Sequence, residues 1–240
     1  MATRTKSVST RTAKSDGMTM YLKRVFALMC GAIGITALTS FLTMATPLWQ
    51  ALFTPTGLSG FYYVLLFGGL AVSIWAQVRA FHLKPSTAAL LLALYAIMMG
   101  MVMTPLLLVA VTNNPFTILF ACGLTMIMFG CMALFGYKTV RDLSFLGIFL
   151  FMGMIGLILV GLASFIWPAV VGGTFGTIVC LIGVLIFALF TAYDMQTLKN
   201  AYFYVGNGEQ KNQLAVLGAL HLYISFIAMF QYILGLFNRD

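Results

Sequence analysis

Seven long runs of apolar residues, separated by short polar segments, make up most of the chain. We place them at residues 25–45, 61–80, 87–111, 118–136, 144–166, 174–193 and 214–237. Each run is about 20 residues long, the length that an α-helix needs to cross the hydrocarbon core of a bilayer. The runs are continuous rather than alternating, which favours helices over a β-barrel. The pattern therefore predicts an all-α membrane protein, folded as a bundle of seven transmembrane helices.

The third run contains a proline, Pro105. Proline lacks a backbone N–H and can kink a helix or end it early, here at Thr104. Six spans with one re-entrant segment are therefore the alternative to seven.

Composition excludes an ordinary soluble domain. Hydrophobic residues make up 62% of the 240 residues and charged residues only 8%, and the mean hydropathy is +1.03. The apolar runs leave no room for a soluble domain. We predict a single transmembrane domain over residues 21–240, preceded by a basic tail over residues 1–20 that we interpret as disordered. A transit peptide or a tail that binds the lipid surface would have a similar composition.

Basic residues fall in the N-terminal tail and in every second loop between the runs. Beyond the N-terminal segment, which also includes Lys23 and Arg24, they are Arg79 with Lys84, Lys138 with Arg141, and Lys199 with Lys211, which leaves only Arg239 out of place. The positive-inside rule then places the N-terminus in the cytoplasm and, with seven spans, the C-terminus on the opposite side. This arrangement accounts for the net charge of +8 without a nucleic-acid partner.

One acidic residue, Asp194, lies at the end of an apolar run; the others, Asp16, Asp142, Glu209 and Asp240, lie in tails or loops. A carboxylate facing lipid costs about 3 kcal/mol or more, so Asp194 is a candidate functional residue. Its alternative role is a helix-end carboxylate that reaches water. Arg79, at the same predicted membrane face, is the natural counter-ion.

Enzyme signatures are scarce. The sequence contains no G-x-S-x-G, no H-E-x-x-H and no glycine-rich phosphate loop. His82 and His221 lie on different segments. A nucleophile and base could be paired only as Ser225 and His221, four residues apart on the last run. Such a pair more often bonds to neighbouring helices, so we predict that the protein is not an enzyme.

Two segments carry a specific resemblance: GYKTVRDLS from Gly136 and AYDMQ from Ala192, supported by the apolar stretches around them. With them the chain resembles the Bax inhibitor-1 family of membrane proteins, which has bacterial members. The resemblance implies a seven-helix bundle with the last helix central, and in some members a pH-sensitive calcium leak. It also implies a latch of two aspartates that share a proton, one on the sixth helix and one on the seventh.

The first aspartate of that latch corresponds to Asp194, but Ser225 occupies the position of the second. Ala228 and Met99 also stand where polar or acidic residues are typical of the family. Calcium prefers six to eight oxygen ligands, so Asp194 is at most a weak metal ligand, and we expect no cofactor other than a weakly bound calcium ion. His221 lies one turn before Ser225, and histidine changes charge near neutral pH. We therefore predict an ion or proton site at Asp194, His221 and Ser225.

The resemblance leaves two functions open. The leading interpretation is a pH-sensitive cation leak, with calcium as the ion, in a protein with an incomplete aspartate pair. The alternative is a non-conducting regulator that binds other membrane proteins, such as a quality-control protease. The lipid bilayer is the expected environment in both cases. The motifs favour a bacterial plasma (inner) membrane, with an organellar membrane as the alternative.

Overall fold

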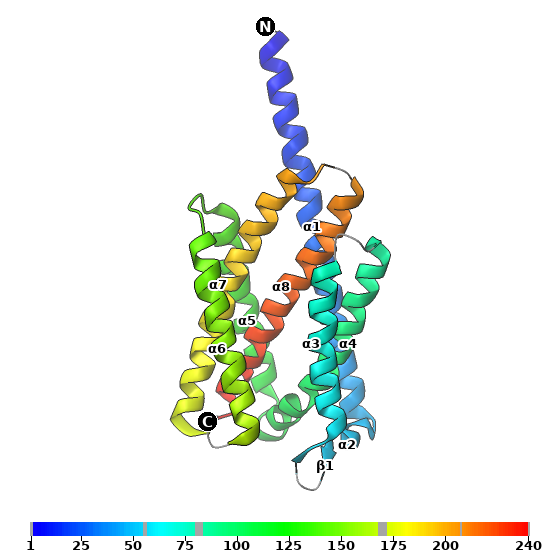
Figure 1. Ribbon diagram of the computed structural model, residues 1–240, viewed down its shortest axis with the longest axis vertical. Helices are drawn as coiled ribbons and strands as arrows, with labels where there is room; N and C mark the ends of the chain where they lie inside the picture. Colours follow the sequence, from blue (N-terminus) through cyan, green and yellow to red (C-terminus); the bar gives the residue numbers. More distant parts are fainter. Residues whose placement is uncertain (1, 55–56, 80–83, 168–171, 207, 240) are drawn as a thin grey trace.

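Long, nearly parallel helices dominate the computed structural model, which describes residues 2–54, 57–79, 84–167, 172–206 and 208–239 (Figure 1). Side chains are described for these ranges except at residues 2–16, 165 and 166. The helices are α1 (Ala2–Ala45), α2 (Leu48–Ala51), α3 (Gly60–Arg79), α4 (Pro85–Asn113), α5 (Phe116–Lys138), α6 (Ser144–Ile166), α7 (Gly173–Tyr204) and α8 (Gly208–Phe237). Strands β1 (Phe53–Thr54) and β2 (Gly57–Leu58) pair antiparallel, Phe53 opposite Leu58.

Seven of the described helices, all except α2, are long and apolar enough to cross a membrane. This confirms the predicted seven-helix bundle. Helix α4 continues through Pro105 to Asn113, so the alternative with six spans and a re-entrant segment was wrong. Proline is tolerated inside membrane helices because neighbouring groups can satisfy the backbone that it frees.

Two helices extend beyond the apolar runs that predicted them. Helix α1 begins at Ala2, within the segment for which we expected disorder, and Met18 near the end of that segment is buried. Helix α7 continues eleven residues past the predicted end at 193, to Tyr204. Apolarity marks the part of a helix that contacts lipid, whereas the helix itself ends where its backbone pairing ends.

Helix α8 is the centre of the bundle. It packs against α1, α3, α4, α5 and α7, and Figure 1 shows it crossing the middle of the molecule. Of the most apolar stretch of α8, 72% is buried, against 6% for the peripheral helix α6. The central last helix that the family resemblance implied is therefore present, and the polar side chains of Tyr223 and Ser225 near its middle are buried.

Hydroxyl groups fix α8 against α1 and α4 in the middle of the bundle. The Tyr223 hydroxyl lies 2.6 Å from Thr36 Oγ1, and Thr36 is in turn within hydrogen-bond distance of the Ala96 carbonyl, at 3.1 Å. Ser40 Oγ donates to the Gly100 carbonyl at 2.8 Å. Interhelical hydrogen bonds of this kind hold membrane helices together because lipid gives helices no hydrophobic reason to associate. They set the position of α8 relative to its neighbours.

Candidate functional site

Asp194 lies inside α7, ten residues before its last residue, Tyr204. The expectation that it follows the last turn of the helix was therefore wrong. The polar residues after it contain no glycine or proline before Gly206, so nothing in them stops the helix. Asp194 is only 8% exposed. A carboxylate at this depth must be satisfied by protein groups rather than by reaching water at a helix end.

Helix α8 supplies those protein groups. Ser225 Oγ donates a hydrogen bond to Asp194 Oδ2 at 3.0 Å. His221, one turn earlier on α8, places Nδ1 4.0 Å from Asp194 Oδ1. Residues four apart lie on one face of a helix, so both side chains meet the same carboxylate. The structure thus brings together Asp194, His221 and Ser225, the three residues that the sequence nominated.

The fourth nominated residue, Arg79, is not part of this cluster. It is exposed at the end of α3, and in the described part of the chain the ion pair of Asp194 is with His221. Helix α3 contributes Gln77 instead, whose Oε1 accepts a hydrogen bond from His221 Nε2 at 3.1 Å. The other histidine, His82, lies outside the described residues.

The four-residue cluster of Gln77, Asp194, His221 and Ser225 can hold one exchangeable proton. When His221 Nε2 donates to Gln77, the neutral ring leaves Nδ1 as an acceptor facing Asp194. A proton on Nδ1 makes an ion pair with the carboxylate, and a proton on the carboxyl leaves both groups neutral. Hydrogen bonds to an ionised group are roughly twice as strong as neutral ones. The strength of the α7–α8 contact therefore depends on where this proton is.

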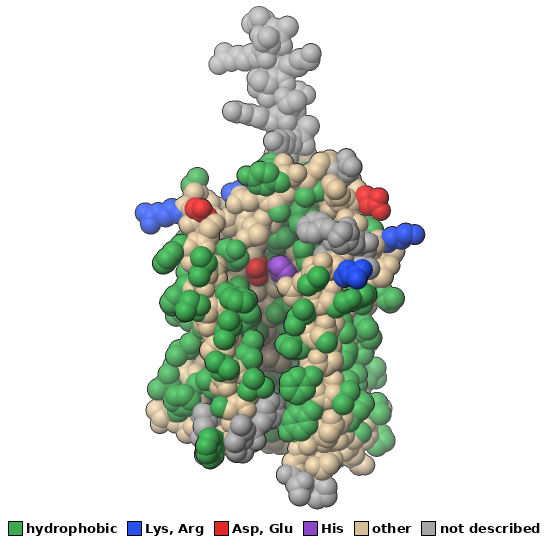
Figure 2. Space-filling view, viewed as in Figure 1, with side chains coloured by type: hydrophobic (Ala, Val, Ile, Leu, Met, Phe, Trp, Pro, Cys, Tyr) green, Lys and Arg blue, Asp and Glu red, His purple; other side chains and the backbone are tan. Residues whose placement is uncertain are grey.

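The cluster is reached from the side of the bundle. The side chain of His221 is 35% exposed and that of Asp194 is 11% exposed. Figure 2 shows an acidic side chain beside a histidine in a hollow of an otherwise apolar face, while Lys and Arg gather near the end from which the N-terminal helix projects. His221 is therefore the more exposed partner of this ion pair.

The two specific sequence motifs meet next to this cluster. Gln196, two residues after Asp194, binds the loop between α5 and α6 through both atoms of its amide. Its Oε1 accepts from the Leu143 N–H at 2.9 Å, and its Nε2 donates to the Arg141 carbonyl at 2.7 Å. Lys199 Nζ donates to the Tyr137 carbonyl at 2.8 Å. The motif AYDMQ on α7 thereby fixes the motif GYKTVRDLS, which runs from the end of α5 into the loop before α6. The sequence did not reveal this function of Gln196.

Ser225 and His221 are not arranged as a nucleophile and its base. The Ser225 hydroxyl donates to Asp194, and no hydrogen bond joins it to His221 in the region for which side chains are described. The His221 ring is occupied by Gln77 on one nitrogen and faces Asp194 with the other. The hydroxyl is therefore engaged in holding α7 to α8.

Metal ligands are sparse. In the described part of the chain, no three His, Cys, Asp or Glu side chains converge in a way that could hold a metal ion. Met99, at the position where the family often has an acidic residue, is half-buried on α4. Asp194 is the one carboxylate of the cluster, so a calcium ion here would need most of its oxygen ligands from backbone groups or water.

Taken together, the fold and the cluster define a polytopic integral membrane protein in which the central helix binds a buried carboxylate. The sequence profile of the family described as "Inhibitor of apoptosis-promoting Bax1" matches residues 18–240. The chain belongs to this family, as the motifs predicted.

Bacterial relatives cover most of the chain. The inner membrane protein YbhL of Escherichia coli is 31% identical over 227 residues, which are 93% of each chain. A Rickettsia prowazekii protein is 29% identical over 220 residues, covering 91% of this chain and 89% of the relative. A Caulobacter vibrioides protein is 34% identical over 189 residues, covering 77% and 72%. For the first two relatives the similarity thus covers about nine-tenths of this chain.

Proposed function

We propose that the protein is a pH-sensitive cation leak whose α7–α8 contact is controlled by the proton on Asp194 and His221. The observation that carries the proposal is the 3.0 Å hydrogen bond from Ser225 to Asp194. Ser225 occupies the position at which the family resemblance implies a second aspartate. The latch is thus closed here by a hydroxyl and a histidine in place of a second carboxylate.

The proton changes the strength of the latch. With Asp194 ionised and His221 protonated, the carboxylate holds a charge-assisted hydrogen bond from Ser225 and an ion pair with His221. Movement of the proton onto the carboxyl, or its loss from His221, removes the ion pair. Because α8 is central, a change in its contact with α7 is transmitted to its contacts with α1, α4 and α5.

We propose calcium as the conducted ion and a bacterial plasma membrane as the location, with the N-terminus cytoplasmic. The name of the relative YbhL, an inner membrane protein, supports the location. The concentration of basic residues in alternate loops supports the orientation. We further propose that the protein is not an enzyme and requires no cofactor, a calcium ion binding at most weakly near Asp194.

Ion flux into liposomes tests this proposal. Purified protein should admit calcium at a rate that changes with pH, because the ion pair of His221 and Asp194 depends on the position of one proton. Asp194→Asn, which cannot ionise, should lose most of this pH dependence. Asp142→Asn is the matched control, because Asp142 is an exposed loop carboxylate whose hydrogen bonds, among the described residues, are with Ser144. Equal pH dependence in all three proteins would refute the proposal.

A restoring substitution tests the latch geometry separately. Ser225→Asp places a second carboxylate opposite Asp194, and two close carboxylates titrate as a coupled pair because both cannot ionise easily. We expect this variant to strengthen the pH-gated flux severalfold. An inert Ser225→Asp protein that folds normally would show that the leak mechanism of the family does not apply here.

The second candidate is a non-conducting regulator that binds other membrane proteins. It is favoured by the single carboxylate of the cluster, which offers few charged ligands to a divalent ion. This candidate predicts no flux at any pH together with reproducible recovery of the same partner, such as a quality-control protease. If the cluster has no part in binding, the Asp194→Asn protein should still recover the same partner.

A further inference from the structure

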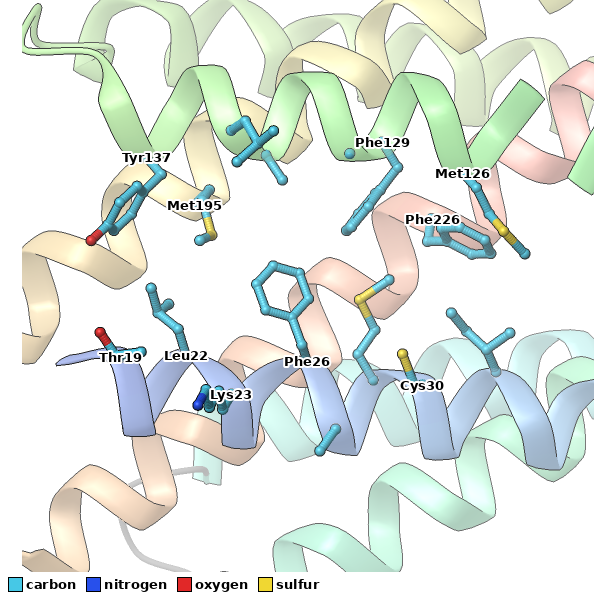
Figure 3. Close-up of a pocket in the computed structure, with 16 residues that line it drawn as sticks. Thr19, Leu22, Lys23, Phe26, Cys30, Met126, Phe129, Tyr137, Met195 and Phe226 are labelled. Atoms are coloured by element: carbon cyan, nitrogen blue, oxygen red, sulfur yellow. The ribbon is translucent and has the colours of Figure 1, made fainter. Parts of the chain in front are cut away.

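A groove of about 930 Å³ opens on the flank of the bundle between α1 and α5. Figure 3 shows α1 on one side, α5 on the other, and Met195 and Phe226 behind them. Both walls belong to spanning helices, so the mouth of the groove faces the lipid phase. Its floor is next to the polar cluster in sequence, because Met195 follows Asp194 and Phe226 follows Ser225.

The lining of the groove is amphipathic along its length. Thr19, Lys23 and Tyr137 lie at one end, whereas Phe129, Met126 and Cys30 lie further along (Figure 3). The polar end coincides with the last turn of α5, which also carries Lys138. One cation and two hydroxyls thus lie at the polar end, and the rest of the lining is apolar.

The length of the groove corresponds to one leaflet. Along α1 it extends from Thr19 to Ile33, about 21 Å at the rise of an α-helix. The hydrocarbon core of a bilayer is about 30 Å thick, so one leaflet with its headgroup layer is about this long. A lipid with its headgroup near Lys23 and an acyl chain along the apolar lining would match this length.

We propose that this groove binds one anionic phospholipid, with an acyl chain between α1 and α5 and the phosphate headgroup at Lys23. Basic pockets between membrane helices are suited to anionic headgroups, and the apolar wall is suited to the chain. The positive charge selects an anionic lipid over a zwitterionic one. This inference concerns lipid binding and does not depend on ion conduction.

Native mass spectrometry of delipidated protein tests the proposal, with phosphatidylglycerol and phosphatidylcholine of the same acyl chains as probes. We expect one phosphatidylglycerol molecule to bind at least fivefold more tightly than phosphatidylcholine. Lys23→Gln should remove this preference, whereas Lys84→Gln, at an exposed lysine that does not line the groove, should retain it. Equal binding of both lipids to the wild-type protein, or no bound lipid, would overturn the proposal.

Filling the groove is the second test. A Cβ at Gly130, which lines the groove, meets no atom within 4 Å, and the same holds at Gly123, which does not line it. Both positions therefore accept a Cβ without a clash. Gly130→Phe should reduce phosphatidylglycerol binding at least fivefold, and Gly123→Phe should leave it unchanged. Unchanged binding in Gly130→Phe, or equal loss in both variants, contradicts binding in this groove.

Discussion

Asp194 contacts two side chains of α8, Ser225 and His221. His221 in turn contacts a side chain of α3. Ser225 contacts the carboxylate directly, and Gln77 holds the His221 ring from the opposite side. Each bond joins a different pair of helices, so a single proton is linked to the arrangement of three helices. This is the physical basis on which we assign function to the cluster rather than to any single residue.

A loop carboxylate provides a prediction with a defined sign. Asp142 accepts hydrogen bonds from both the hydroxyl and the backbone N–H of Ser144, and these hold its pKa below the ordinary value of 3.8. Because the folded pKa is lowered, ionised Asp142 stabilises the folded protein at pH values above the ordinary pKa. This stabilisation is lost as the pH falls through the folded pKa. In Ser144→Ala, which keeps only the backbone donor, the Asp142 pKa should rise towards 3.8, as measured by NMR titration. An unchanged titration curve would contradict this explanation.

At the cluster, the sequence identified three residues and missed the fourth. Ser225 and His221 could be found because their four-residue spacing and the motif on α7 are visible in the chain. Gln77 could not, because hydropathy does not give the rotation of α3 about its axis. At about 100° per residue, Gln77 and Arg79 project about 200° apart. Only one of them can face α8, and the charge of Arg79 made it the more conspicuous choice.

At the scale of elements, close approach of α5 and α7 supports the cluster. A Cβ at Gly136 would collide with the carbonyl group of Ala192, two residues before Asp194. Small residues permit such backbone contact between membrane helices. Gly136, the first residue of GYKTVRDLS, therefore leaves room for the backbone of Ala192, the first residue of AYDMQ.

Gly136→Ala should accordingly destabilise the protein by about 1–3 kcal/mol, the usual cost of overpacking. Thermal unfolding in detergent measures the effect as a lower midpoint. Gly123→Ala on the same helix is the control, because a Cβ at Gly123 meets nothing within 4 Å and alanine favours helix over glycine. A midpoint for Gly136→Ala equal to that of the control would exclude a tight α5–α7 contact.

Helix existence was predictable and helix ends were not. Seven continuous apolar runs identified the seven spanning helices because the bilayer imposes their length. The same runs placed the end of α7 at residue 193, whereas the helix reaches Tyr204. The extension decides the environment of Asp194, because it lengthens α7 alongside α8 and buries the carboxylate.

At the scale of the whole molecule, charge is concentrated at one end. In Figure 1 the two termini lie at opposite ends of the bundle. The Lys and Arg side chains visible in Figure 2 gather near the N-terminal end, and Arg239, beside the C-terminus, is the exception. Positively charged segments are retained on the cytoplasmic side during membrane insertion. The molecule should therefore have a cytoplasmic N-terminus and a C-terminus on the opposite side.

Reporter fusions test this orientation. A green fluorescent protein fused after residue 240 should be dark when exported by the general secretory route, and alkaline phosphatase at the same position should be active. The same reporters fused after Val205, in the α7–α8 connection at the basic end, should give the reverse pattern. Fluorescence from the C-terminal fusion without phosphatase activity would reverse the assigned orientation.

The most direct test of the whole account is the distance between α7 and α8 as a function of pH. Spin labels at two exposed positions, Leu185 on α7 and Glu209 on α8, report this distance by pulsed electron paramagnetic resonance. We predict that the distance distribution changes with pH, and that Asp194→Asn abolishes the change while Asp142→Asn preserves it. An unchanged distribution, or a change that persists in Asp194→Asn, would show that the proton on Asp194 does not control the contact.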